Sequence, residues 1–212
     1  MKMNALLLHG MGRTPASMLL LAHRLHGFGI NTNLFGYSTF ACFDAVVNRL
    51  VKRVQALPSA RPFILVGHSL GSVLIRAALP LLGPLAPAGC FFVASPTCAC
   101  RAARFFGGSR VFRLVTRDMG GALASTEFMS ALPVPACPMR IYAGTGGFRG
   151  RFSPFGREAN DGILAVSETA LGSEPVVTVP SVHTFIMNSK VIARDIAETA
   201  LSLRSDEGRQ RR

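Results

Sequence analysis

The 212-residue sequence contains no tryptophan and only two tyrosines, and it carries 11 acidic residues against 23 lysines and arginines. A formal net charge of +12 is compatible with nucleic acids, an anionic membrane surface or acidic substrates as partners. RNA-binding proteins commonly stack bases on aromatic side chains, and this sequence also lacks a recognisable nucleic-acid-binding motif. These shortages argue against nucleic-acid binding, and the simplest interpretation of the charge is a solvated, arginine-rich surface.

Long apolar runs are also missing. No stretch reaches the roughly 18 apolar residues of a transmembrane helix, and Met1-Lys2-Met3-Asn4 leads into a predicted strand without a cleavable signal. The five cysteines are an odd number and lack the paired spacing of zinc sites, so we expect reduced, mostly buried thiols. Together these absences predict a soluble protein of the cytoplasm.

Only 16% of the residues are charged, whereas 49% are hydrophobic and there are 21 glycines and 13 prolines. This composition is typical of a compact, turn-rich protein and argues against disorder. The length suits one domain, which we place at residues 1–207, with residues 95–138 as a cap or insertion inside it. Residues 208–212 are expected to form a charged, disordered tail.

Short apolar segments alternate with segments of helical periodicity along the chain. The expected strands are Ala5–Leu8, Asn31–Phe35, Phe63–Val66, Cys90–Ala94, Arg140–Ala143 and Val176–Val179. The expected helices are Pro15–Gly27, Phe43–Gln55, Ser72–Leu82, Thr126–Ala131 and Ser189–Leu203. The alternation predicts the α/β class, as a three-layer α/β/α sandwich with a mostly parallel central sheet of about six strands. In such sheets, ligands bind beyond the carboxyl ends of the strands.

The pentapeptide Gly67-His68-Ser69-Leu70-Gly71 lies directly between a predicted strand and a predicted helix. This context is that of a nucleophile elbow, a turn so tight that its central residue adopts a strained backbone and lifts its side chain off the sheet. A β-carbon on Gly67 or Gly71 would strike the neighbouring strand or helix. Ser69 is therefore the candidate nucleophile, placed where helix N-terminal amides face developing negative charge.

A serine hydroxyl needs a base to remove its proton, and histidine has a suitable pKa. His183 follows the last predicted strand within a short loop, which places it at the correct edge of the sheet. His23 and His26 are expected on a solvated helix surface, and the side chain of His68 is expected to point away from the serine hydroxyl. His9 is expected to lock its loop by hydrogen bonding. We therefore predict His183 as the base.

The third member of such a site orients the imidazole and stabilises its charged form. Asp161 follows the loop after a predicted strand, and its neighbours Asn160 and Gly162 indicate a tight turn that would present the carboxylate. Glu158 and Asp118 are the alternatives. With Asp161 the chain order is serine, aspartate, histidine, which is the order of α/β-hydrolase triads.

Acyl transfer also needs donors for a tetrahedral oxyanion. One is the backbone N–H of Leu70, directly after the nucleophile. The other is predicted in the loop after the first strand, where Gly10 and Gly12 would let the N–H of Met11 turn inward. The alternative is an ordinary glycine-rich turn that leads into the first helix.

No cofactor or metal is expected. The segment from Gly144 to Gly150 is rich in glycine but lacks the register of a nucleotide-binding loop, and no helix is predicted to follow it. No Gly-Lys-Ser or Gly-Lys-Thr sequence occurs, and no histidine, aspartate and glutamate cluster has metal-ligand spacing.

With these residues placed, the chain resembles the α/β-hydrolase superfamily, and most closely its small bacterial lipase- and esterase-like members that lack the first two strands of the full fold. The resemblance spans residues 4–203. Its marks are His9-Gly10-Met11-Gly12-Arg13-Thr14, Gly67-His68-Ser69-Leu70-Gly71, Asn160-Asp161-Gly162 and Val182-His183-Thr184-Phe185. Many relatives have a glycine where this chain has Ser72.

The resemblance implies a Ser69–His183–Asp161 triad and hydrolysis of carboxylic esters through an acyl-enzyme intermediate, with a small-molecule or lipid ester as substrate. The alternatives are an acyltransferase or thioesterase that uses the same triad, and a catalytically inert interaction protein on the same fold. The superfamily hosts many chemistries, so the resemblance does not define the substrate.

Arginines and phenylalanines alternate in residues 95–138. They could form a basic amphipathic cap that meets an anionic membrane surface weakly, although packed helices with solvated arginines are the favoured interpretation. The apolar residues Phe148, Phe152 and Phe155 of the glycine-rich loop are compatible with an acyl-chain wall or a second small core.

Overall fold

The computed structural model describes residues 2–57, 62–99, 101 and 118–210. Six strands form one sheet in the order β2-β1-β3-β4-β5-β6, and every neighbouring pair is parallel. The strands are β1 (Asn4–Leu8), β2 (Asn31–Phe35), β3 (Phe63–His68), β4 (Gly89–Val93), β5 (Met139–Gly144) and β6 (Val176–Val179). All six predicted strands are thus confirmed, in a sheet that is wholly parallel.

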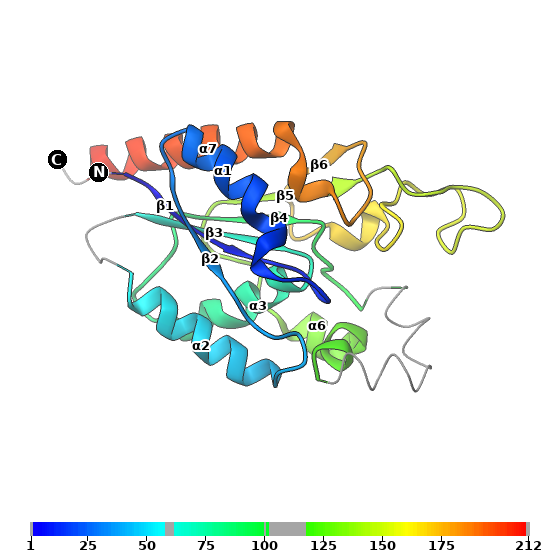
Figure 1. The fold of residues 1–212 in the computed structure, drawn as a ribbon. Helices are drawn as coiled ribbons and strands as arrows, with labels where there is room; N and C mark the ends of the chain where they lie inside the picture. Colours follow the sequence, from blue (N-terminus) through cyan, green and yellow to red (C-terminus); the bar gives the residue numbers. More distant parts are fainter. Residues whose placement is uncertain (1, 58–61, 100, 102–117, 211–212) are drawn as a thin grey trace.

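Helices cover both faces of the sheet (Figure 1). One face carries α1 (Leu19–Gly27) and α7 (Lys190–Gln210), and the other carries α2 (Phe43–Gln55), α3 (Leu70–Ala78) and the short α6 (Thr126–Ala131). Four 3₁₀ turns complete the described elements: η1 (Pro15–Met18), η2 (Leu79–Leu81), η3 (Val166–Thr169) and η4 (Ile186–Asn188). The structure is the three-layer α/β/α sandwich that the sequence predicts.

The central strands are buried on both faces, which is why their sequences are continuously apolar. In β3, Leu65 packs into the core under α2 and α3, whereas Ile64 and Val66 pack into the core under α1 and α7. The two-residue period of the strand thus joins both hydrophobic layers. This packing anchors the end of β3, where the elbow begins.

Some predicted boundaries shift. Helix α3 begins at Leu70, two residues earlier than predicted, because the tight turn at Ser69 leads straight into the helix. The predicted domain boundary at residue 207 falls inside α7, which extends to Gln210. Of the four described cysteines, Cys42 and Cys98 are exposed, so the expectation of mostly buried thiols is wrong for these two. Among the described residues, no helix is both long and apolar enough to cross a bilayer.

Most of the arginines and phenylalanines of the predicted cap lie in residues 102–117, outside the described residues. Within the described part, residues 118–124 are helical and α6 follows. Ser125 caps α6, because its hydroxyl accepts a hydrogen bond from the backbone N–H of Phe128 at 3.1 Å. Arg101 belongs to a different contact, described below with Glu158.

Candidate active site

Ser69 occupies the turn between β3 and α3 in a strained backbone conformation. Its φ of 51° and ψ of −118° are unusual for a residue with a side chain. The strain is held by hydrogen bonds on both sides of the residue: Ser69 N–H donates to Val93 O at 2.9 Å, and Ser72 N–H donates to Ser69 O at 2.9 Å. The sequence pattern predicted this geometry, and the structure has it.

The two glycines of the pentapeptide are required by close backbone contacts. A β-carbon on Gly67 would lie 2.5 Å from the backbone nitrogen of Ser72, and one on Gly71 would lie 2.6 Å from Leu8 O. Both contacts are with backbone atoms, which cannot move aside cheaply. Ser72, which replaces a frequent glycine, fits because its hydroxyl donates to Gly67 O at 2.7 Å.

Asp161 and His183 lie together at the carboxyl edge of the sheet. His183 Nδ1–H donates to Asp161 Oδ2 at 2.7 Å, and the aspartate side chain is almost completely buried. The other carboxylate oxygen, Oδ1, accepts the backbone N–H groups of Ile163 at 2.9 Å and Leu164 at 2.7 Å. A backbone hydrogen bond from His183 N–H to Asp161 O, 2.9 Å long, joins the two loops as well. Asp161 therefore orients the imidazole and leaves its Nε2 available.

His68 connects this pair to the elbow. Its Nε2–H donates to the backbone carbonyl oxygen of His183 at 3.1 Å, and the two imidazole centroids are 5.0 Å apart. Burial, followed by the nearby positive charge of protonated His183, holds the pKa of His68 well below its usual value. His68 is therefore a neutral, buried side chain. Among the described residues, the bonded ring nitrogens of His68 and His183 contact His183 O and Asp161 Oδ2, and no hydrogen bond from Ser69 Oγ to either ring is found.

The alternative acids make other contacts. The Glu158 carboxylate forms an ion pair with Arg101 at 2.6 Å and accepts a short hydrogen bond from the hydroxyl of Ser167. Both contacts lower the pKa of Glu158, and the hydrogen bond from the Ser167 hydroxyl has the larger effect. Asp118 is exposed at the start of the helical residues 118–124. Of the three candidate acids, only Asp161 contacts His183.

The loop after β1 is held by a hydrogen bond within the loop and by contacts with Tyr37, two residues after β2. His9 is fully buried, and its Nδ1–H donates to Gly10 O at 2.9 Å. Its ring stacks on Tyr37 with centroids 4.1 Å apart, and the Tyr37 hydroxyl donates to His9 O. Burial lowers the pKa of His9, so the ring is a neutral support. Sequence reasoning missed Tyr37, because nothing in the local pattern after β2 links it to this loop.

The glycines of that loop differ in their roles. A β-carbon on Gly10 would lie 2.7 Å from His68 Nδ1 and 3.2 Å from Ser69 Cβ, so Gly10 packs directly against the elbow. Gly12 has a φ of +65°, which favours glycine, with open space around it. In the part of the chain that the structure describes, neither Met11 N–H nor Leu70 N–H donates a hydrogen bond. The oxyanion role of these two N–H groups stays a prediction.

The glycine-rich segment after β5 packs the acid and base loops together. A β-carbon on Gly144 would lie 2.4 Å from Ser181 O and 2.8 Å from Asp161 Cβ. At Gly147 the same atom would lie 1.9 Å from Asn160 Oδ1. These glycines allow close approach of the chain to the loops that carry Asp161 and His183. The sequence shows this glycine cluster and its lack of a nucleotide-binding register, but it does not show that the glycines pack against the loops of Asp161 and His183.

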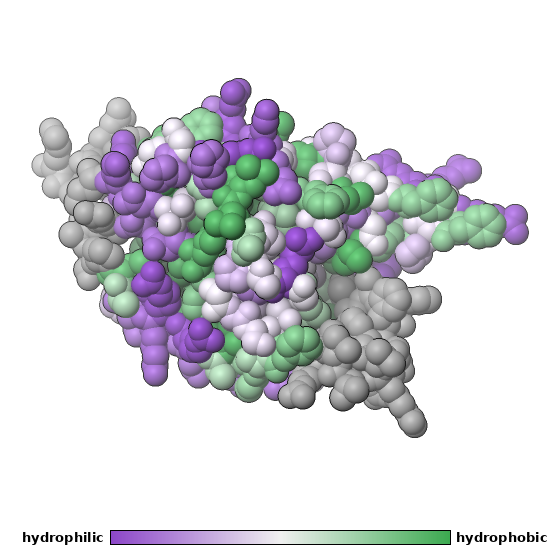
Figure 2. Space-filling view, viewed as in Figure 1, coloured by the Kyte–Doolittle hydropathy of each residue, from purple (hydrophilic) through white to green (hydrophobic). Residues whose placement is uncertain are grey.

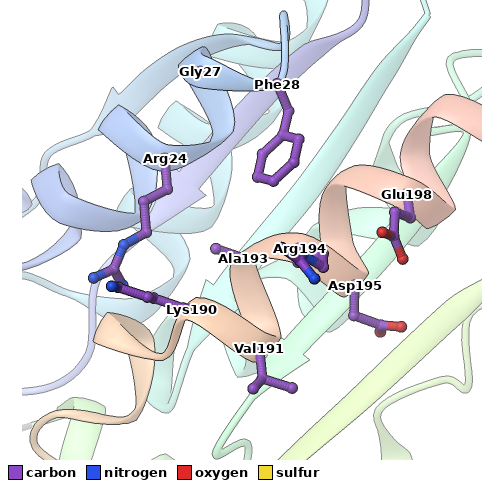
Figure 3. A pocket seen from close by; sticks show the side chains of 9 residues that line it. All are labelled: Arg24, Gly27, Phe28, Lys190, Val191, Ala193, Arg194, Asp195 and Glu198. Atoms are coloured by element: carbon purple, nitrogen blue, oxygen red, sulfur yellow. The ribbon is translucent and has the colours of Figure 1, made fainter.

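A cavity lies away from these residues. A groove of about 800 Å³ runs between the end of α1 and the first turns of α7 (Figure 3). Arg24, Lys190 and Arg194 contribute positive charge to it, and Phe28 and Val191 contribute apolar surface. Its lining also includes the acidic residues Asp195 and Glu198 and contains no serine, cysteine or histidine. Among the described residues, no group of three or more histidines, cysteines or acids is placed to hold a metal.

Solved structures resemble this chain closely in fold. The mature form of the Bacillus licheniformis lipase BlEst2 matches with a TM-score of 0.77 at 14% identity, covering 94% of this chain and 92% of that one. The metagenomic carboxyl esterase MGS0156 matches with a TM-score of 0.67 at 16% identity, over 98% of this chain and 76% of that one. Human thioesterase 2 matches with a TM-score of 0.59 at 14% identity, over 96% and 98%.

No protein-family model matches the sequence, and neither does any curated protein. The likeness is therefore one of structure rather than of sequence. It shows that the chain has the α/β-hydrolase fold in a minimal form with six parallel strands.

Proposed function

We propose that this protein is a serine hydrolase that cleaves carboxylic esters through an acyl-enzyme intermediate. The observation that carries the proposal is the 2.7 Å hydrogen bond from His183 to the buried carboxylate of Asp161, on a loop that His68 joins to the strained turn at Ser69. The resemblance of the fold to a lipase and to a carboxyl esterase supports the same reaction class.

Acylation follows from these positions. In the neutral tautomer with its proton on Nδ1, directed at Asp161, His183 would accept the proton of Ser69 Oγ at Nε2 as that oxygen attacks the ester carbonyl carbon. The carbonyl oxygen becomes an oxyanion, and the N–H groups of Met11 and Leu70 would stabilise it. The tetrahedral intermediate then collapses, and the alcohol leaves with the proton that His183 returns.

Deacylation repeats these steps with water as the nucleophile. His183 takes a proton from water, the resulting hydroxide attacks the acyl-enzyme, and the acid is released as Ser69 recovers its proton. The carboxylate of Asp161, in contact with the imidazole, would balance the imidazolium charge in both halves of the cycle. Its two backbone donors on Oδ1 leave Oδ2 directed at His183, which maintains the required tautomer.

A thioester is the second candidate substrate, because human thioesterase 2 and the RedJ thioesterase of Streptomyces coelicolor share the fold. The same serine and histidine would act on it, since only the leaving group changes. An acyltransferase would differ in its acyl acceptor, and an inert scaffold would lack turnover.

One experiment separates ester hydrolysis from thioester hydrolysis and from an inert scaffold. Purified full-length protein is assayed with a chain-length series of p-nitrophenyl esters and with matched acyl thioesters, and a fluorophosphonate probe is mapped by mass spectrometry. We expect ester turnover and probe attached to Ser69, both lost in Ser69→Ala. Labelling with faster thioester cleavage would favour a thioesterase, whereas neither labelling nor turnover in a folded protein would refute the proposal.

A further inference from the structure

The loop from residue 145 to residue 157, called here the tip loop, presents two phenylalanines to solvent. Phe152 is 85% exposed and Phe148 is 68% exposed, and no other large hydrophobic side chain in the described part of the chain is as open as either. Figure 1 shows this yellow-green loop extending beyond the body of the sandwich. Exposed aromatic side chains in such a position commonly mark a site of contact with another surface.

The tip loop is folded by its own backbone. Gly150 N–H donates to Gly156 O at 2.8 Å, Ser153 N–H donates to Gly150 O at 3.0 Å, and Gly156 N–H donates to Ser153 O at 3.0 Å. At its base, Asn160 Nδ2 donates to Phe148 O at 3.1 Å. Gly150 and Gly156 have positive φ values, which the turn requires. The phenylalanines are therefore held outward by an ordered turn.

The third phenylalanine of the loop is arranged differently. Phe155 is only 5% exposed, and the guanidinium of Arg101 lies 5.6 Å from its ring centroid. It anchors the loop to the body of the protein, as a small core residue would. Of the three phenylalanines expected to form an acyl-chain wall or a second small core, only Phe155 is buried. Phe148 and Phe152 face solvent.

Positive charge surrounds the exposed rings. Arg149, Arg151 and Arg157 lie in the loop, and no acidic residue occurs between residues 144 and 157. The Arg151 guanidinium lies 5.5 Å from the Phe152 ring centroid. Figure 2 shows hydrophobic and hydrophilic side chains next to each other along this projection. Aromatic rings beside arginines suit a boundary between acyl chains and anionic head groups.

We propose that the tip loop docks the protein onto anionic lipid surfaces. A convex projection with two rings can enter an interface directly, whereas a protein partner would need a matching pocket. A second copy of this chain is disfavoured, because each copy carries +12 and would bring the same arginines together. The loop leads directly into Asp161, so docking would hold the carboxyl edge of the sheet near the lipid. The docking itself is independent of the proposed hydrolysis.

The lack of tryptophan makes the insertion directly measurable. Phe152→Trp gives the chain a single tryptophan, and it is combined with Ser69→Ala so that no vesicle lipid is consumed. With phosphatidylglycerol-containing vesicles, we expect a blue shift of its emission and quenching by lipid-borne quenchers. Phosphatidylcholine vesicles should give a much weaker response. The control is Leu81→Trp in the same background, at a 53% exposed apolar residue in η2, whose emission should not change.

Vesicle sedimentation provides the second measurement. In the Ser69→Ala background, Phe148→Ser with Phe152→Ser should lower the partition coefficient on anionic vesicles roughly tenfold or more. Arg149→Ser with Arg151→Ser should lower it by about tenfold as well, and high salt should remove that difference. Leu81→Ser and Arg53→Ser are the matched controls and should bind as the parent does.

Three outcomes would overturn the proposal. The first is partitioning of the tip-loop variants equal to that of the controls, and the second is equal binding to neutral and anionic vesicles. The third is self-association, detected by sedimentation velocity, that the phenylalanine variants abolish while vesicle binding is absent.

Discussion

His68 Nε2 donates a hydrogen bond to the backbone carbonyl oxygen of His183, 3.1 Å away. The bond ties the loop of the proposed base to the residue directly before the proposed nucleophile. His68 is buried, and among the described residues its Nδ1 has no hydrogen-bond partner. Because its role is to hold His183 in place, it is a positioning residue in the proposed mechanism.

Removing that bond should slow the reaction while leaving substrate binding unchanged. We expect His68→Leu to lower kcat for a p-nitrophenyl ester about tenfold, with a much smaller change in KM, because one hydrogen bond that orients the base is lost. His68→Gln keeps an N–H donor and should recover part of the rate. Equal rates for the leucine and glutamine variants, with both proteins folded, would contradict this role.

The elbow could be predicted from sequence because Gly67, Ser69 and Gly71 lie within five residues, between an apolar strand and a helix. The clash that demands glycine at position 67 is with the turn itself, whereas the one at position 71 is with Leu8 and His9. The strands were equally accessible, since burial on both faces makes them continuously apolar.

Other contacts could not be predicted, because they join segments that are far apart in the chain. Tyr37 supports His9 from the segment after β2, and Gly144, the last residue of β5, packs against Asp161. Likewise, a phenylalanine in a loop has the same local pattern whether it is buried, as Phe155 is, or exposed, as Phe152 is. Only the folded chain distinguishes these cases.

The choice of acid can be tested by a matched pair of amide variants. Asp161→Asn should lower kcat on the order of 10⁴-fold, because an amide no longer maintains the tautomer and charge of His183. Glu158→Gln removes the partly exposed ion pair with Arg101 and should change the rate less than twofold and stability by less than about 1 kcal/mol. A larger rate loss in Glu158→Gln than in Asp161→Asn would show that Glu158, and not Asp161, is the acid.

Backbone strain at Ser69 predicts a gain in stability when this proposed nucleophile is replaced by glycine. With φ at 51°, a side chain is disfavoured, whereas glycine adopts this region freely. We expect Ser69→Gly to raise the free energy of unfolding by about 1 kcal/mol relative to Ser69→Ala, measured by urea denaturation. Both variants should be inactive, so activity cannot explain the difference. Equal stability of the two would argue against stored strain at this residue.

The close packing of the elbow against β1 predicts a strong effect at Gly71. Its added β-carbon would lie 2.6 Å from Leu8 O and 2.8 Å from His9 O, so Gly71→Ala should lower the free energy of unfolding by about 3 kcal/mol or prevent folding. Gly27, the last residue of α1, has no atom within 4 Å of such a β-carbon. Gly27→Ala should therefore be neutral or stabilising by about 0.5 kcal/mol. Similar effects at both glycines would contradict the packing argument.

Stability should fall in mildly acidic solution, because two buried histidines are neutral in the folded state. Burial lowers the pKa of His68 well below 6.5 and also lowers that of His9. At pH values between the folded pKa of these histidines and their unfolded pKa near 6.5, the unfolded chain binds more protons than the folded chain. The free energy of unfolding therefore decreases as the pH falls below about 6.5. The slope approaches about 1.4 kcal/mol per pH unit for each such group.

His68→Leu removes one of these histidines, so its denaturation midpoints between pH 7.5 and pH 5.5 should decline less steeply than those of the parent. His26→Gln, at an exposed position in α1, is the control for removal of a histidine as such. A parent and a His68→Leu variant with the same slope would mean that His68 accepts its proton without cost in the folded protein, which its burial and its unpartnered Nδ1 argue against.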